Sequence, residues 1–144
     1  MIVGFTGTRN GMSAAQLQVV GKLLLEFSPE EFHHGNCIGA DVQAETMVGR
    51  QLTQCLIHRH PCTLGGQQSI IPAPPGTIVH KEKPPLDRNW DIVDASTVIV
   101  ATPKEKMEIR RSGTWATIRY ARKAGRPLYI VYPDGLIYYA RGFG

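Results

Sequence analysis

Two buried strands joined through a helix constrain the fold of this chain more than any other feature of its sequence. Residues 97–101 and 128–132 are short β-branched or apolar runs, which are typical of strands buried on both faces. Between them, residues 114–124 carry apolar side chains at helical spacing, and Gly125 followed closely by Pro127 is a helix stop signal. This order predicts a strand–helix–strand unit of a parallel sheet.

The rest of the chain repeats this alternation. Ser13, with Gln16 three residues later, matches the capping box that begins a helix. The predicted strands are residues 2–6, 31–34, 56–60, 97–101 and 128–132, and the predicted helices are residues 13–27, 41–52, 88–95 and 114–124. Residues 77–80 and 136–139 are weaker strand candidates. We therefore expect residues 1–144 to form a single α/β domain, a Rossmann-like doubly wound sheet that is mostly parallel.

The composition is that of an ordinary globular protein. Of the 144 residues, 42% are hydrophobic and 19% are charged, and the formal net charge is +4. This mild positive charge fits an anionic small-molecule ligand, whereas nucleic-acid binding is not expected because glutamates interrupt the densest basic group, residues 104–111. Three cysteines without framework spacing, no signal-peptide pattern and no long apolar run predict a cytoplasmic protein without membrane contact.

Three small-residue turns follow predicted strands, and each leads toward a helix. In a doubly wound sheet the carboxyl ends of the strands meet along one edge, where ligands bind. A turn at a helix N-terminus also presents free backbone N–H groups and the positive end of the helix dipole, which suit a phosphate. We therefore predict a ligand-binding pocket formed by Gly7, Thr8, Arg9, Asn10, Gly35, Cys37, Gly39, Ala40, Asp41, Arg88, Asn89, Ser112, Gly113 and Thr114.

Several of these positions have a second, purely structural interpretation that the sequence leaves open. Arg9 suits bidentate phosphate binding or a surface salt bridge. Asp41 can accept a hydrogen bond from a ribose or base, or it can be the N-cap of the next helix. Arg88 and Asn89 either reach the pocket or lie exposed at a loop-to-helix junction. Trp115 can stack on a base, although a place in the core is the favoured interpretation.

Residues 62–85 interrupt the alternation of strands and helices with repeated proline and glycine. This composition predicts a loop that contains at most one short strand. Long loops inside compact domains are usually functional, so this loop is a candidate lid over the pocket.

Histidine and cysteine residues gather in two stretches. His58, His60 and Cys62 alternate, so an extended strand would place them on one face, and three more lie within residues 33–37. These residue types bind zinc, but their spacing matches no standard zinc motif and Pro61 interrupts the strand. We therefore predict no metal site, and no cofactor is assigned.

The residues around the turns resemble those of a known family. Residues 4–9 (GFTGTR) match a Gly-x-Thr-Gly-x-Arg pattern, residues 35–41 (GNCIGAD) match Gly-x-x-x-Gly-Ala-Asp, and residues 113–117 (GTWAT) begin the last helix. Over about residues 2–135 this order resembles the SLOG superfamily of Rossmann-like nucleotide-binding proteins. The small single-domain YspA- or YAcAr-like branch is the most similar to this chain.

The resemblance implies either a binding protein or an enzyme. Relatives of the LOG branch are phosphoribohydrolases that cleave nucleoside monophosphates with one of two paired glutamates, but Ala116 and Thr117 stand at those positions here. Other relatives bind nucleotide-derived signals, including cyclic ADP-ribose-type molecules. We therefore favour a protein that senses or sequesters a nucleotide or nucleotide-derived signal, cyclic or NAD-derived, without cleaving it. The alternative is an N-glycosidic hydrolase or deoxyribosyltransferase-like enzyme with Asp41 or Asp91 as its carboxylate.

The resemblance also bears on assembly. Relatives are commonly dimers or larger, so a homo-oligomer is expected. The apolar run at residues 136–139 offers an edge at which two copies could pair.

Overall fold

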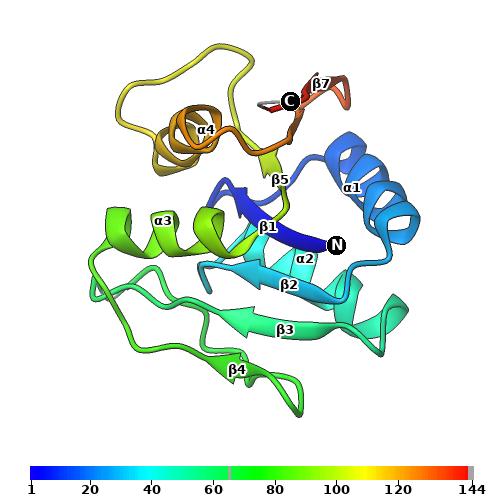
Figure 1. Cartoon of the computed structure of the whole chain (residues 1–144), viewed down its shortest axis with the longest axis vertical. Coiled ribbons are helices and arrows are strands. Elements are labelled where there is room, and N and C mark those ends of the chain that lie inside the picture. Colours follow the sequence, from blue (N-terminus) through cyan, green and yellow to red (C-terminus); the bar gives the residue numbers. More distant parts are fainter. Residues whose placement is uncertain (65, 143–144) are drawn as a thin grey trace.

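One seven-stranded sheet forms the centre of the computed structural model, which describes residues 1–64 and 66–142 (Figure 1). The strands are β1 (Ile2–Gly7), β2 (Glu31–His34), β3 (Leu56–Arg59), β4 (Ile78–Val79), β5 (Val98–Thr102), β6 (Leu128–Val131) and β7 (Ile137–Ala140). The helices are α1 (Ala14–Phe27), α2 (Ala40–Gln51), α3 (Pro85–Ala95) and α4 (Gly113–Lys123). The strand order is β4-β3-β2-β1-β5-β6-β7, and all neighbours are parallel except β6 and β7.

The helices cover both faces of the sheet. α1 packs beside α2 on one face, and α3 packs beside α4 on the other (Figure 1). Phe5 and Phe32 lie in the core under α1 and α2, while Ile99 of β5 lies in the second core with Ile118 of α4. This arrangement confirms the predicted Rossmann-like doubly wound fold. Trp115 is 2% exposed in the second core, which confirms its favoured interpretation.

The chain changes direction across the sheet between β1 and β5. From β1 it builds outward through β2 and β3 to β4, and it then returns to place β5 on the other side of β1. The connection that follows β1 and the connection that follows β5 therefore run in opposite directions along the sheet. A crevice lies between them at the carboxyl ends of these two strands. Ligands bind at such a point in open α/β sheets.

The predicted boundaries differ from the observed ones by a few residues. The largest difference is at α3, which begins at Pro85 rather than at Arg88. Pro84 is its N-cap and Pro85 occupies the first helical position, where the missing N–H and fixed φ of proline are well tolerated. Pro84 and Pro85, which lie at the end of the predicted loop, thus begin the helix.

The predicted loop at residues 62–85 contains β4 and leads into α3. Gly65, like Phe143 and Gly144, lies outside the described residues. Hydrogen bonds from Ile38 N to Gln67 O (2.9 Å) and from Ser69 N to Asn36 O (2.8 Å) attach the loop to the turn after β2. The loop therefore begins beside one of the three predicted turns.

A buried ion pair connects α2 with the sheet. Glu45 of α2 is 4% exposed, and its carboxylate accepts from Arg59 Nε (2.8 Å) and Arg59 Nη2 (2.7 Å) of β3 and lies 3.0 Å from His34 Nε2 of β2. Arg59 Nη1 also donates to Ile71 O (2.9 Å). The carboxylate of Glu45 thus joins α2 to β2 and β3. Arg59 in turn joins these elements to the long loop.

The last strand lies at an edge of the sheet. β7 pairs antiparallel with β6 and leaves Ile137, Tyr138 and Tyr139 exposed. The weak strand candidate at residues 136–139 is therefore a strand, and its role in oligomer formation stays a prediction. Within the described part of the chain, no helix is long and apolar enough to cross a membrane.

Candidate functional site

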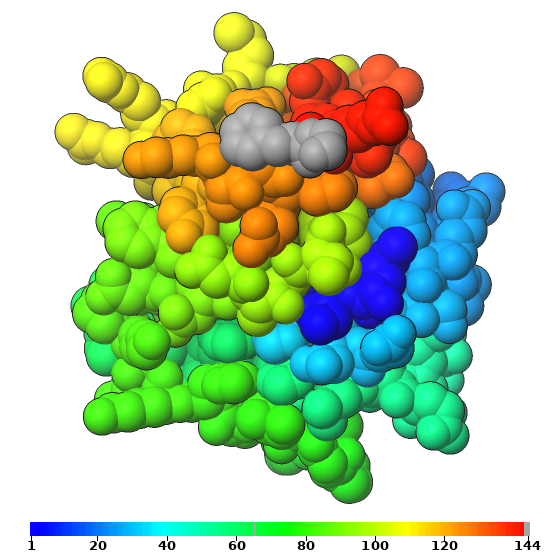
Figure 2. Space-filling view, in the orientation of Figure 1, coloured from blue at the N-terminus to red at the C-terminus, as the bar shows by residue number. Residues whose placement is uncertain are grey.

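A cavity of about 480 Å³ opens at the carboxyl ends of β1 and β5. Its walls come from the turn after β1, the turn after β2, one side of α3, and the loop that joins β5 to α4. This loop carries exposed side chains that stand clear of the surface, drawn in yellow in Figure 2. The volume is in the range of small-molecule sites, which is about 300–1,000 Å³.

All three predicted turns contribute to this cavity. The predicted site residues that line it are Gly7, Thr8, Arg9, Asn10, Gly35, Cys37, Asp41, Arg88, Asn89, Ser112, Gly113 and Thr114. Gly39 and Ala40 are not among the lining residues. The fold therefore brings together residues that lie more than one hundred positions apart in the sequence.

Gly39 and Ala40 hold the first two turns against each other. Ala40 N donates to Thr8 O at 3.0 Å. Gly39 has a φ of 86°, and a Cβ at this position would lie 2.4 Å from the backbone oxygen of Arg9. Only glycine allows this close approach. Gly39 and Ala40 therefore support the wall of the cavity without lining it.

The start of α4 presents unused backbone donors to the cavity. Ser112 is the N-cap, and its hydroxyl accepts from Trp115 N at 3.2 Å. Within residues 1–64 and 66–142, nothing accepts from the N–H groups of Gly113 or Thr114. A Cβ on Gly113 would meet no atom within 4 Å, so the fold itself does not require glycine there. The site thus has the donors and the space that an anion needs at a helix N-terminus.

Asp41 is a buried carboxylate with one free oxygen. It is 5% exposed, and its Oδ2 accepts from Cys37 N at 3.1 Å. Its Oδ1 has no hydrogen-bond partner in the described part of the chain. Burial raises the pKa of this carboxyl, against the lowering effect of the nearby His34 and Arg88. Gly39 is the N-cap of α2, so the interpretation of Asp41 as the N-cap is wrong.

Arg88 is largely engaged by the protein itself. It is 7% exposed, and its Nη1 donates to Gly35 O and to His60 O (3.0 Å), while Nη2 lies 3.7 Å from Cys37 Sγ. The interpretation of Arg88 as an exposed junction residue is therefore wrong. Its Nε is buried without a hydrogen-bond partner among the described residues. Arg88 therefore holds the second turn in place, and the cations that can contact a ligand are other residues.

Three cations at the cavity are not committed to internal ion pairs. Arg9, Lys104 and Arg111 are exposed, line the cavity, and take part in no salt bridge with the residues that the structure describes. The surface salt bridge considered for Arg9 is therefore not formed there. With them on the wall are two acidic groups, Asp41 and Glu105, and Glu105 already accepts from the indole N–H of Trp115 at 3.2 Å. The free charge that faces the cavity is mostly positive, which favours an anionic ligand.

Neither Cys37 nor Asp91 has the surroundings that a reactive group requires. Burial, followed by the nearby Asp41, raises the pKa of the Cys37 thiol to about 11, which disfavours the thiolate. Asp91 does not line the cavity and pairs with Lys83 at 2.7 Å on the surface. Of the two aspartates proposed for catalysis, Asp41 alone lines the cavity.

Comparison with known proteins supports the fold. The chain is similar to the solved structure of a molybdenum cofactor binding protein from the phototrophic bacterium Rippkaea orientalis, with a TM-score of 0.66 and 17% sequence identity. The match covers 91% of this chain and 76% of that one. No protein-family model and no curated protein sequence matches the chain. At this identity the likeness establishes a shared architecture.

The β5–α4 loop contributes residues that the sequence patterns do not predict. Lys104, Glu105, Ile109 and Arg111 line the cavity, whereas from sequence the charge pattern of residues 104–111 argues only against nucleic-acid binding. The sequence does contain an indication of this role, because the charged loop directly precedes a predicted anion-binding turn. Leu64 and Gln67 also line the cavity, so the predicted lid contributes residues to its wall.

Proposed function

We propose that this cavity binds a phosphate-bearing heterocyclic ligand, a nucleotide or a nucleotide-derived signal, and holds it without cleaving it. One observation carries the proposal: Gly113 and Thr114, whose N–H groups are unused, line the same cavity as Asp41, whose buried Oδ1 has no hydrogen-bond partner among the described residues. The phosphate binds at Gly113 and Thr114, where the helix dipole adds to the N–H groups. Asp41 accepts from a hydroxyl or amino group on the sugar or base. The resemblance of the turns to the SLOG superfamily favours a nucleotide.

Three free cations strengthen the preference for a phosphorylated ligand. Arg9, Lys104 and Arg111 surround the cavity, and a guanidinium can bind phosphate through two parallel hydrogen bonds. Arg9 belongs to the turn after β1, whereas Lys104 and Arg111 belong to the β5–α4 loop, so a ligand with more than one phosphate could engage them together. Their exposure favours reversible capture, consistent with sensing or sequestration.

The structural neighbour adds a related ligand to be tested. That protein binds the molybdenum cofactor, which like a nucleotide combines a phosphate with a heterocycle. The proposed contacts at Gly113 and Asp41 suit either ligand. A phosphorylated pterin therefore belongs in the same binding experiment.

An N-glycosidic hydrolase is the second candidate, because of Asp41. A buried carboxyl with a raised pKa that lines a pocket is a candidate general acid or base. An enzyme would release free base and ribose phosphate from a nucleoside monophosphate. Asp41→Asn would then abolish release, while Asp87→Asn, on the exposed side of α3, would leave it unchanged.

The proposal is tested by equilibrium dialysis of the protein against nucleoside mono- and diphosphates, cyclic nucleotides, NAD-derived cyclic species and a phosphorylated pterin. The protein is then heat-denatured, and the released compounds are identified by mass spectrometry. Recovery of one class intact supports a binding protein, and the class recovered distinguishes nucleotide from pterin. Appearance of free base would replace this proposal with the hydrolase. If no phosphorylated ligand is retained and no free base is released, both proposals are refuted.

Gly113→Ala is expected to weaken binding of the retained ligand by about tenfold or more without destabilising the protein. Its Cβ would meet no protein atom within 4 Å, so the new methyl group enters the cavity beside the N–H donors. A displaced phosphate loses charge-assisted hydrogen bonds, each worth about 1.5–3 kcal/mol. Isothermal titration gives the affinity and thermal unfolding gives the stability. Gly21→Ala in α1, which is equally free of contacts, is the control.

A further inference from the structure

Four of the five histidines form a layer on one face of the sheet. His33 of β2 pairs in register with His58 of β3, and His60 and His80 follow at the ends of β3 and β4. The rings of His33 and His58 stack with centroids 3.9 Å apart and planes 9° apart. Those of His60 and His80 stack at 4.1 Å and 7°. None of these residues lines the cavity described above.

One glutamate lies beside two of the rings. Glu31 Oε1 lies 3.3 Å from His33 Nε2, with which it forms a hydrogen bond, and 2.8 Å from His58 Nε2, which has no hydrogen-bond partner among the described residues. Because a carboxylate only accepts, His33 Nε2 carries the proton and His33 Nδ1 is unprotonated. The Nδ1 atoms of His33 and His58 face His60 Nε2 (2.8 Å) and His80 Nε2 (2.9 Å), respectively.

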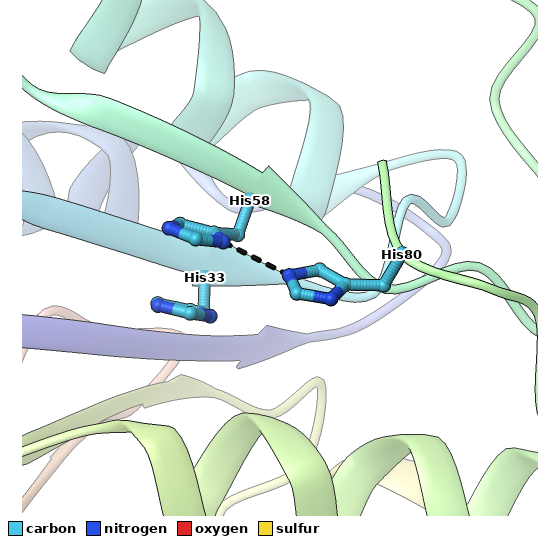
Figure 3. Close-up of side chains that lie close together, drawn as sticks. All are labelled: His33, His58 and His80. Atoms are coloured by element: carbon cyan, nitrogen blue, oxygen red, sulfur yellow. Dashed lines mark hydrogen bonds between the residues drawn. The ribbon is translucent and has the colours of Figure 1, made fainter. Parts of the chain in front are cut away.

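Imidazole nitrogens therefore converge between the two stacked pairs. Figure 3 shows His33 beneath His58, with His80 approaching the same side from the next strand. One nitrogen each from His33, His58 and His80 lies within 4.8 Å of the other two. A tetrahedral zinc ion with Zn–N bonds of about 2.0–2.1 Å needs nitrogens about 3.4 Å apart and lies in the plane of each ring, so the stacked rings must tilt toward each other to complete the geometry.

We propose that His33, His58 and His80, with His60 as the fourth ligand, bind a divalent transition-metal ion, zinc(II) being the ion that suits them best. Imidazole is a ligand for zinc, copper and nickel, and tetrahedral nitrogen coordination favours zinc. The proposal replaces the expectation from the sequence that the chain has no metal site. The ion would join β2, β3 and β4 at the edge of the sheet.

One further feature fits a metal better than a simple hydrogen-bonded core. Glu31 accepts from the far nitrogen of His33 and lies 2.8 Å from the far nitrogen of His58, an arrangement similar to the one that commonly orients metal-binding histidines.

The position of the layer leaves room for an ion to enter. α3 packs against β1 and β2, but in the described part of the chain no helix makes comparable contact with β3 or β4. His33 and His58 are buried, and His80 is more exposed at the rim. An ion can therefore reach the nitrogens past His80.

Metal binding is measured on the tag-free chain after treatment with a chelator. The protein is dialysed against zinc(II), and the bound metal is counted by mass spectrometry and its affinity measured by chelator competition. One zinc per chain, and a cobalt(II) spectrum typical of tetrahedral nitrogen coordination, are expected. His80→Gln, the least buried of the proposed ligands, should bind zinc at least about tenfold more weakly.

Two variants separate a metal site from a structural one. His34→Gln alters a histidine on the opposite face and should leave the zinc affinity unchanged. Glu31→Gln removes the negative charge beside His33 and His58 and should weaken binding by about 10–100-fold while the cobalt spectrum keeps its tetrahedral form. Circular dichroism checks that each variant is folded. No retention of zinc, cobalt, nickel or copper by the folded wild type, or equal zinc affinity in His80→Gln and His34→Gln, would overturn the proposal.

Discussion

Replacing Gly39 by alanine is expected to lower the free energy of unfolding by about 3 kcal/mol or more. Gly39 has φ 86° and ψ −125°, a backbone conformation that residues other than glycine rarely adopt. Its new Cβ would also lie 2.4 Å from Arg9 O and 2.8 Å from Thr8 O, both backbone atoms that cannot move aside cheaply. Urea denaturation followed by circular dichroism measures the loss.

The same helix provides the matched control. Gly49 lies in α2, where a Cβ would meet no atom within 4 Å, so Gly49→Ala should stabilise the protein by about 0.5–1 kcal/mol. Because Gly39 holds the first two turns together, its replacement should also weaken ligand binding. Similar unfolding free energies for Gly39→Ala and wild type would contradict the close packing of these turns.

Replacing Glu45 by glutamine is expected to lower the free energy of unfolding by about 3–5 kcal/mol. Glutamine nearly preserves the volume of the side chain, but it leaves the guanidinium of Arg59, which is 5% exposed, without a counter-charge. His34 Nε2 also loses the charge of its carboxylate partner at 3.0 Å. Glu26→Gln, on the exposed side of α1, is the control and should change stability by no more than about 0.5 kcal/mol.

The pH dependence of stability provides a second measurement of this pair. Burial raises the pKa of Glu45, but hydrogen bonds from Arg59 and His34 outweigh it and hold the pKa at about 2, below its usual 4.5. The stabilisation is therefore complete above pH 4.5 and is lost as the pH falls toward 2. The difference in unfolding free energy between wild type and Glu45→Gln should shrink over this interval. A difference that stays constant would mean that the ion pair does not stabilise the fold.

Local sequence patterns were sufficient to predict the elements that surround the cavity. Ser13 with Gln16 predicted the start of α1, where both bonds of the capping box are present. The glycine turns were predictable because a buried strand followed by small residues and then a helix allows few other backbone arrangements. Arg88 was harder, since its burial depends on Gly35 and His60, which lie 53 and 28 residues away in sequence.

The histidine layer could not be derived from the sequence for a similar reason. Alternation correctly places His58 and His60 on one face, and their rings stack there. The meeting with His33 depends on the register between β2 and β3, and the meeting with His80 depends on β4 pairing with β3 after a long loop. Register between strands is set by long-range packing, which residue spacing does not reveal. The loop residues Lys104 and Arg111 are likewise positioned by irregular backbone.

The most direct test of the proposed phosphate-binding site is a titration followed by backbone amide NMR. The isotope-labelled protein is titrated with the phosphorylated ligand that it retains in dialysis, and with the dephosphorylated form of that ligand. The account predicts that the amide signals of Gly113 and Thr114 shift the most with the phosphorylated ligand and little without the phosphate. Shifts that leave these two amides unchanged and lie instead at the histidine layer or at β7 would contradict it.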